Sequence, residues 1–399
     1  MEIRNLTKGD MTKVIKLHQY AYGFWTDKDI TEQDYEDMIP ENIIGLFDND
    51  ELMSVLTIMK VKQAIRGVLK GMWGISMVGT YPEARMKGYI RSLMQTAFLQ
   101  MKEQGLSLSM LEPFRESFYT QFGYVPAHDK FRITAPLDGL RIASAAVIGE
   151  GWKFKRVAGS DAKEDYLAFI QDHAPTKYHG YAFNPNIRDE EWKQRNKNRL
   201  YVFVRRQGKV EALARYQIKG YMHFEEPGQL IIEEMYWRNL ESQAALFNFL
   251  GKHRDQVKQL QIRAPYGIDF QHWFMDLKDW IEIKVWHPWM VRIIDIKEAL
   301  NGLPAPREGE LTLKITDPQC GWNNGIYLLQ SVSGILNVTT TKRVPRIETT
   351  THGISALVYG THSLEAIEYA RWIKGLNKQI REILKEWFPQ LSLYNPYTY

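Results

Sequence analysis

Along residues 1–150, short apolar runs alternate with stretches in which apolar side chains recur every three to four positions. The first pattern is typical of strands, and the second is typical of helices that present one face to a core. The predicted strands cover residues 3–6, 43–47, 53–61, 72–78, 106–111 and 131–135, and the predicted helices cover residues 11–22, 90–104 and 116–122. Asn49-Asp50 separates two of these strands and predicts a hairpin. This first unit is therefore expected to be α+β.

A glycine-containing turn, Gly79–Gly88, joins one of the predicted strands to a predicted helix. The first N–H groups of a helix have no partner within the helix, and with the positive end of the helix dipole they form an anion site. Arg85, Lys87 and Arg91 add positive charge, and Gly88 allows a ligand to approach the backbone closely. The pattern indicates a turn that binds a diphosphate, and hence a nucleotide-type cofactor.

The same mixture of the two periods returns in residues 151–290. Helices are predicted over residues 161–173 and 240–252, and strands over residues 200–206, 211–219, 229–237 and 259–264. Between the third of these strands and the following helix, nothing resembles the turn Arg85–Gly88. The second α+β unit is therefore expected to lack a cofactor site.

A third unit, residues 291–399, starts near an apolar strand at residues 290–295. Its further strands are predicted over residues 310–316, 326–330 and 334–339. Apolar residues then recur at helical spacing from Leu364 to Trp387, which predicts one long amphipathic helix that Pro389 ends. Terminal tails are usually polar and frayed, whereas Gln390–Tyr399 is aromatic, so we expect this tail to be docked.

The composition is that of an ordinary soluble globular protein, with 44% hydrophobic and 25% charged residues among 399. This length is too great for one compact core and predicts two or three domains. A formal charge of +4 gives no reason to expect a nucleic acid partner. Aromatic residues reach 13%, which large ligand pockets or extensive subunit interfaces would use.

Cys320 is the only cysteine, which rules out an intramolecular disulfide and a thiolate metal cluster. The ten histidines show neither a His-Glu-x-x-His motif nor paired ligand spacing, so no metal is expected. The N-terminus carries no apolar signal segment, and no run reaches the roughly 18 apolar residues of a membrane span. A cytoplasmic location without a membrane span is the expectation.

The anion turn and two other features carry a resemblance to a known family. Residues 78–91 resemble the acetyl-CoA pyrophosphate signature of the GCN5-related N-acetyltransferases (GNAT), and Pro113–Tyr124 resembles their aromatic helix and Phe-Gly-Tyr turn. The layout of the whole chain resembles the enhanced intracellular survival (Eis-like) acetyltransferases. The resemblance implies an α+β fold with GNAT-like domains at residues 1–150 and 151–290, the second one degenerate. A sterol-carrier-protein-like α+β domain is implied at residues 291–399.

Carried over position by position, the resemblance implies an acetyl-CoA site and two catalytic groups. The cofactor contacts fall on Val78, Gly79, Thr80, Arg85, Met86, Lys87, Gly88, Tyr89, Ile90, Arg91, Phe114 and Arg115. Met86 departs from the pattern, because relatives more often have arginine there. The family's general acid maps to Tyr119, and its general base maps to the free carboxylate of the last residue, Tyr399. Phe24 and Trp25 lie where relatives line an acceptor cleft.

Several of these residues have a purely structural alternative. Tyr119 has aromatic neighbours and can serve packing alone, and a terminal residue such as Tyr399 is usually disordered. Lys60, Lys62 and Arg66 flank the hairpin, and we interpret them as a solvated strand face rather than a functional patch.

The predicted function is acetyl-CoA-dependent N-acetylation of primary amines by direct attack in a ternary complex. By resemblance, the acceptors are aminoglycoside-like polyamines or lysine side chains, and the assembly is a homo-oligomer, a hexamer in relatives. Cys320 gives no support for an acetyl-enzyme and is interpreted as a structural thiol. Two alternatives stay open: a lipid carrier with an apolar cavity in residues 293–388, and a transferase of the same duplicated fold that uses another acyl donor.

Overall fold

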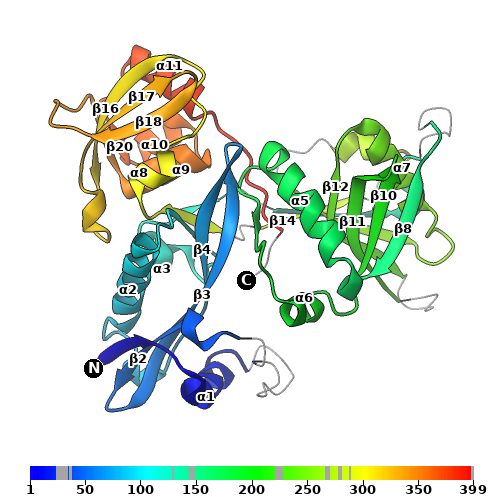
Figure 1. Ribbon diagram of the computed structural model, residues 1–399, viewed down its shortest axis with the longest axis horizontal. Coiled ribbons are helices and arrows are strands. Elements are labelled where there is room, and N and C mark those ends of the chain that lie inside the picture. The colour runs from blue at the N-terminus through cyan, green and yellow to red at the C-terminus, as the bar shows by residue number, and fades with distance from the viewer. Residues whose placement is uncertain are drawn as a thin grey trace.

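The computed structural model describes residues 1–23, 35, 38–127, 130–142, 149–220, 228–265, 270–276, 281–286 and 289–396. These residues form three units, each built on its own sheet. A long hairpin of β3 and β4 stands in the middle of the molecule, with the second unit on one side and the third unit on the other (Figure 1). None of the helices in these residues has the length and apolar character needed to cross a bilayer.

The first sheet has the strand order β1-β2-β3-β4-β5-β15-β6, and β9 pairs with β3. Its strands are β1 (Glu2–Asn5), β2 (Ile43–Asp48), β3 (Glu51–Ile65), β4 (Val68–Thr80), β5 (Leu108–Leu111), β6 (Val125–Pro126), β9 (Ala182–Phe183) and β15 (Met290–Ile293). Its helices are α1 (Met11–Tyr22), α2 (Tyr89–Glu103) and α3 (Glu116–Thr120). Val55 packs with α1 and the neighbouring Leu56 packs with α2, so the two helices cover opposite faces of the sheet.

The second sheet has the order β14-β7-β13-β12-β11-β10-β8. Its strands are β7 (Lys130–Pro136), β8 (Lys153–Ala158), β10 (Leu200–Arg206), β11 (Lys209–Lys219), β12 (Gln229–Trp237), β13 (Gln259–Pro265) and β14 (Glu282–Trp286). The helices of this unit are α5 (Lys163–Lys177), α6 (Asp189–Arg195) and α7 (Leu240–Gly251). Figure 1 shows α5 and α6 on the side of the unit that faces the β3–β4 hairpin.

The first two sheets each contain a strand that belongs to the other by chain order. β7 follows β6 along the chain but lies between β13 and β14, and β15 follows β14 but lies between β5 and β6. The apolar pattern predicts both strands but assigns residues 131–135 to the first unit and residues 290–295 to the third. The structure corrects both assignments, and the change of sheet falls between Pro126 and Lys130 rather than near residue 150. Periodicity identifies a strand but carries no information about its distant partner.

The third unit has a sheet of order β18-β17-β16-β19-β20. Its elements are α8 (Ile296–Leu300), β16 (Gly309–Thr316), β17 (Gly325–Val332), β18 (Ile335–Thr340), β19 (Ile347–Thr350), α9 (Thr351–Tyr359), α10 (Leu364–Tyr369), β20 (Ile373–Lys374) and α11 (Lys378–Trp387). The long helix predicted from Leu364 to Trp387 is therefore wrong, because β20 interrupts it. Arg371 and Gly375 adopt φ of 58° and 87°, which an α-helix does not contain.

Arg66 ties the first unit to the third. Its guanidinium donates to the carbonyl oxygens of Leu357 at 2.8 Å, Val358 at 2.8 Å and Pro389 at 2.9 Å. The prediction of a solvated strand face therefore fails at Arg66, although the two neighbouring lysines are exposed. Burial lowers the pKa of Arg66 to about 10, and the three carbonyls accept from three of its five donors.

Candidate active site

β4 and β5 pair in parallel only over Met72–Ile75 and Leu108–Leu111. β4 continues to Thr80, and its register against β3 shifts in this last part of the strand. Met77 lies in the shifted segment with a φ of 49°. In the described part of the chain, residues 76–80 of β4 consequently have no strand partner on the side that faces β5. This side offers backbone hydrogen-bonding groups to a ligand.

Two side chains of α1 hold the shifted segment of β4. His18 Nε2 lies 3.2 Å from the carbonyl oxygen of Met77, and the Tyr22 hydroxyl donates to the carbonyl oxygen of Val78 at 2.5 Å. Burial lowers the pKa of His18 to about 4 and raises the pKa of Tyr22 to about 12. Both side chains are therefore neutral at pH 7 and act as hydrogen-bonding supports rather than as charges.

Gly79 and Thr80, both predicted to contact the cofactor, also have structural partners. A Cβ built on Gly79 would lie 2.4 Å from Leu17 Cδ2, so glycine lets α1 pack closely against β4. The Thr80 hydroxyl lies 2.7 Å from the hydroxyl of Ser54 on β3. The side chains of this strand end therefore serve packing and pairing, which leaves its backbone as the part available to a ligand.

The turn between β4 and α2 has the form of an anion site. After a short 3₁₀ turn at Pro82–Ala84, Met86 and Gly88 adopt φ of 63° and 81°. Gly88 precedes the first residue of α2, and the first helical hydrogen bond runs from Ser92 N–H to Gly88 O at 3.1 Å. The N–H groups of residues 89–91 precede that bond and point out of the helix end, where no side chain caps them.

The side chains around this turn differ in what they contact. Three side chains extend from the turn into solvent, those of Arg85, Met86 and Lys87. The buried Tyr89 donates to Asp48 at 3.3 Å, and Ile90 packs against the core of the first unit. Arg91 donates to the side chain of Gln121 at 3.1 Å, which links the start of α2 to the end of α3. At Tyr89 and Ile90, the backbone alone is available to an anion.

Tyr119 lies on α3 in a cluster of aromatic rings and is 3% exposed. Its ring meets those of Phe114, Phe118 and Tyr124 at centroid distances of 5.8, 5.1 and 6.3 Å. Burial raises the pKa of Tyr119 well above its usual value, so the phenol stays protonated at neutral pH. Phe114 is 72% exposed and forms the outer wall of the cluster, and Arg115 beside it is exposed as well.

Side chains from β15 and the third unit hold the segment that follows Tyr119. The carbonyl oxygens of residues 120–122 accept hydrogen bonds from His352 Nε2 at 2.8 Å, from Gln319 at 3.0 Å and from Arg292, in that order. Thr120 O also accepts from Gly123 N–H at 2.9 Å, and all three carbonyls lie at the end of a short helix, where partners within the helix run out. No local pattern indicates this role, because the three donors lie about 170 to 230 positions away from their acceptors.

Arg292 is fully buried and is paired with Asp317, whose two carboxylate oxygens each lie 2.8 Å from it. The thiol of Cys320 lies 2.9 Å from the same guanidinium, and burial raises its pKa to about 12. The thiol therefore stays protonated, as expected of a structural cysteine. A Cβ on Gly123, at φ 86°, would lie 2.1 Å from Arg292, which explains the glycine of the Phe-Gly-Tyr turn.

The C-terminal tail is docked between the first two units as far as the structure describes it. Tyr394 N–H donates to the carbonyl oxygen of His179 at 2.8 Å. Asn395 accepts from Ala182 N–H at 3.2 Å, and its amide lies 3.7 Å from Met110 Sδ on β5. The tail thus reaches a strand of the first sheet just before Leu111, where β4 and β5 separate.

Three of the predicted site residues, Phe24, Trp25 and Tyr399, lie outside the described residues. The structure brings the others together around one opening of the first sheet: the end of β4, the turn before α2 and the aromatic cluster on α3. His18, Tyr22, Arg292 and His352 support this region and were not predicted. The only sequence signal for the first two is their four-residue spacing on one helix.

Family models match three successive parts of the chain. A GNAT acetyltransferase domain matches residues 2–127, a second GNAT acetyltransferase domain matches residues 184–293, and a sterol carrier protein domain matches residues 296–395. The second match ends with β15, the strand that completes the first sheet. These matches confirm the predicted fold class of two GNAT domains followed by a sterol-carrier-like domain. No curated protein matches the sequence significantly.

Solved structures resemble the chain over essentially its whole length. A GCN5-related N-acetyltransferase from Anabaena variabilis superposes with a TM-score of 0.86 at 18% identity, covering 99% of each chain. A protein of unknown function from Enterococcus faecalis, described as a probable N-acyltransferase, gives 0.84 at 20% identity, covering 100% of this chain and 99% of the other. Eis1 from Mycobacterium abscessus gives 0.81 at 12% identity, covering 100% of both. At these identities the likeness is one of fold.

Proposed function

We propose that this chain, which belongs to the GNAT acetyltransferases and has the three-domain layout of the Eis-like proteins, transfers an acetyl group from acetyl-CoA to a primary amine. The observation that carries the proposal is the uncapped start of α2 beside the unpartnered edge of β4. A diphosphate fits the N–H groups of residues 89–91, with Arg85 and Lys87 in reach of solvent-exposed oxygens. The thioester then extends along residues 76–80 of β4.

The chemical step requires three things of the residues around the opening. The amine nitrogen attacks the thioester carbonyl carbon, and a backbone N–H of residues 77–79 stabilises the developing oxyanion. The carbon–sulfur bond breaks, and Tyr119 gives its proton to the departing thiolate. Tyr119 meets the first condition of a general acid, since burial raises its pKa and keeps it protonated. The same dry surroundings raise the proton affinity of a thiolate, which favours the transfer.

The amine must lose a proton before or during its attack. We assign this role to the terminal carboxylate of Tyr399, three residues beyond the docked Pro396. Three residues extend over at most about 10 Å, and Asn395 already contacts β5 beside the opening. A carboxylate enclosed by aromatic rings is desolvated, which raises its pKa and makes it a stronger base.

The acceptors that we propose are primary amines of the aminoglycoside-like polyamine or lysine side-chain class. Phe24 and Trp25 are assigned to the acceptor cleft on the strength of the family resemblance. We also propose a homo-oligomer, a hexamer as in relatives, which sedimentation velocity measures directly.

A matched pair of glycine variants tests the assignment of the anion turn. Gly88 and Gly105 flank α2 at φ of 81° and 69°, and a Cβ on either residue meets no atom within 4 Å. Gly88→Val and Gly105→Val therefore carry a similar backbone strain, but only Gly88 adjoins the proposed diphosphate. Calorimetry is expected to show at least about 10-fold weaker coenzyme A binding for Gly88→Val, and unchanged binding for Gly105→Val.

The two variants distinguish a loss of the diphosphate site from a general loss of protein stability. If both variants bind coenzyme A as the wild type does, the diphosphate does not lie at this turn. If the folded wild-type protein binds no coenzyme A, the acetyl-CoA proposal as a whole is wrong. Acetylation of a panel of primary amines with acetyl-, propionyl- and longer acyl-CoA then identifies the donor.

A further inference from the structure

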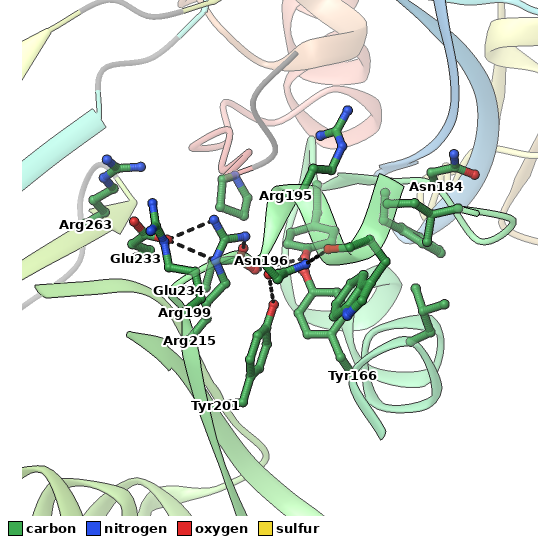
Figure 2. A pocket seen from close by; sticks show the side chains of 16 residues that line it. Tyr166, Asn184, Arg195, Asn196, Arg199, Tyr201, Arg215, Glu233, Glu234 and Arg263 are labelled. Carbon is green, nitrogen blue, oxygen red and sulfur yellow. Dashed lines mark hydrogen bonds and ion pairs between the residues drawn. The ribbon is translucent and has the colours of Figure 1, made fainter. Parts of the chain in front are cut away.

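The second unit contains a cavity of about 310 Å³, and one residue of its lining, Arg195, contacts β3 of the first sheet. Aromatic side chains of α5, α6 and β10, among them Tyr166, Trp192 and Tyr201, form one wall. Charged side chains of β11, β12 and β13 form another, and Pro396 of the docked tail completes the lining. Figure 2 shows the charged groups gathered in the middle of the cavity, with Arg263 at one end and Asn184 at the other. This volume suits a small molecule or one arm of a larger one.

Positive charge dominates the lining, which contains four arginines and two glutamates. Three of the arginines are neutralised. Arg199 and Arg215 each lie 2.8 Å from Glu233, and Arg215 also lies 2.8 Å from Glu234. The third, Arg195, is paired with a glutamate on its own helix at 3.0 Å. These contacts leave one arginine of the lining, Arg263, to be accounted for.

The two glutamates are fully occupied by protein donors. Glu233 accepts from Arg199, Arg215 and, at 2.9 Å, from Gln217. Glu234 accepts from Arg215 through one oxygen and from the hydroxyls of Tyr166 at 2.8 Å and Tyr236 at 2.9 Å through the other. Both carboxylates are 3% exposed. A cationic amine entering the cavity would therefore find no free carboxylate.

Arg263 has no hydrogen bond or ion pair with any described residue. Its Nε is buried without a partner, although the side chain as a whole is only half-buried. It lies near the phenol of Tyr394, where it opposes the rise in pKa that burial causes. A buried, unpartnered donor on a permanently charged guanidinium is costly, and an anion that accepts from it removes the cost.

The other end of the cavity adjoins the opening in the first sheet. Arg195 reaches Met59 Sδ on β3 at 4.0 Å. Met59 lies two residues from Thr57, which pairs with Ser76, the first residue of β4 beyond its pairing with β5. Two residues of a strand span about 7 Å. Pro396 lies in the same lining, three residues before the terminus that we assign as the base.

We propose that this cavity is the distal part of the acceptor site and binds an anionic group of the acceptor, a carboxylate or a phosphate, through Arg263. The acceptor's amine then lies at the opening of the first sheet. This inference rests on the proposed function and narrows it, because it favours lysine-type amines that carry a negative charge over polycations such as aminoglycosides. The unpaired arginine attracts the first class and repels the second.

Paired acceptors that differ in one charge test the inference. The pair is N-α-acetyl-lysine and N-α-acetyl-lysinamide, with 5-aminopentyl phosphate as the phosphate arm. For the wild type, the KM of the free carboxylate is expected to be about 10-fold or more below that of the amide, the effect of one charge-assisted hydrogen bond. Arg263→Met should remove the difference by raising the KM of the free carboxylate to that of the amide, and Arg263→Lys should retain part of the difference. A lower KM for the phosphate than for the carboxylate would identify phosphate as the group bound.

Arg156→Met is the control, because Arg156 is an exposed arginine on β8 of the same unit, outside the cavity. Equal KM values for both lysine compounds in the wild type, or a preference that survives Arg263→Met, would overturn the inference and leave the proposed function intact. If no amine is acetylated, the proposed function fails, and calorimetry with the same two compounds still decides the cavity. The inference is supported if the wild type binds only the free carboxylate and Arg263→Met no longer binds it. Equal binding of both compounds, or binding of neither, contradicts the inference.

Discussion

The first and second sheets are built alike but present different chemistry at the same place. In both, two central strands pair in parallel and then separate, after Ile75 in the first sheet and after Ile232 in the second. In both, a helix follows the first of these strands. α2 starts at Gly88 without a side-chain cap, whereas α7 starts at Asn239, whose side chain accepts from Ser242 N–H at 2.9 Å.

The difference indicates that the first backbone N–H groups of a helix are available to an anion only when no side chain of the protein caps them. Asn239 and Ser242 form a reciprocal capping box, so one of the amides that a diphosphate would use, Ser242 N–H, is already satisfied, and the N–H of the N-cap Asn239 is occupied as well. Where β4 separates from β5, the first sheet presents a backbone segment that His18 and Tyr22 support. The second sheet fills the corresponding place with charged side chains. One fold thus supports the proposed donor site in one copy and a side-chain pocket in the other.

The largest expected effect comes from removing the phenol of Tyr119 at the first sheet. Tyr119→Phe is expected to lower kcat by about 10²-fold to 10⁴-fold, the contribution of a general acid, because the other phenol of the aromatic cluster, Tyr124, is hydrogen-bonded to Ser109 at 2.7 Å. Acetyl-CoA affinity by calorimetry should stay near the wild-type value, since the ring is kept. Unchanged turnover would remove Tyr119 from the chemical step.

The docked tail joins the two sheets and gives the next effect. Deletion of Tyr399, or a tag that moves the terminal carboxylate away, is expected to lower kcat by about 10²-fold or more, since a base is lost. An identical tag at the N-terminus is the control, because Met1 is exposed. Wild-type turnover in the deletion variant would show that the carboxylate is not the base.

Two buried histidines sharpen the comparison through pH. Burial lowers the pKa of His18 on α1 and of His173 on α5 to about 4, against 6.5 for an exposed imidazole. The unfolded chain therefore binds more protons between pH 6.5 and about 4, so stability falls as pH is lowered through this window. Each histidine contributes at most about 3 kcal/mol to that loss.

His18→Gln and His173→Gln should each flatten the fall in Tm below pH 6.5, as scanning calorimetry measures. Only His18→Gln should also lower kcat, because only His18 supports the separated strand of the first sheet. Equal kcat values for the two variants would place the support elsewhere.

The smallest effect tests the cap that distinguishes the second sheet. Asn239→Ala is expected to lower the free energy of unfolding by about 1 kcal/mol, the usual cost of losing an N-cap. Coenzyme A binding should not change, because α7 is not the donor site. A denaturant titration measures the first quantity, and a change in coenzyme A affinity would contradict the assignment.

Local patterns predicted the structural elements of the proposed donor site. The strand, the turn around Gly88 and the start of α2 are encoded within about twenty consecutive residues, so sequence alone located them. The supports of the site could not be predicted in this way. Arg292 and His352 reach α3 from distant parts of the chain, and a local pattern does not record such contacts.

The failures in the fold have two physical origins. α9 was not predicted because nearly all of its residues are buried, which removes the contrast between faces that marks a helix. The helix predicted from Leu364 to Trp387 is broken at Gly375, where a Cβ would lie 2.8 Å from the carbonyl oxygen of Arg346. Such a close approach depends on a strand almost 30 positions away, and periodicity does not record it.

The exchange of β7 and β15 has a consequence for the newly made chain. The first sheet stays incomplete until Ile293 leaves the ribosome, 166 residues after Ala127 (293 − 127), at the end of the first family match. At roughly 5–20 residues per second, this delay lasts about 10 to 30 s, during which the edges of β5 and β6 stay open. The first acetyltransferase domain therefore cannot mature before the second, whose strands all lie between Lys130 and Trp286, and we expect the first sheet to close last.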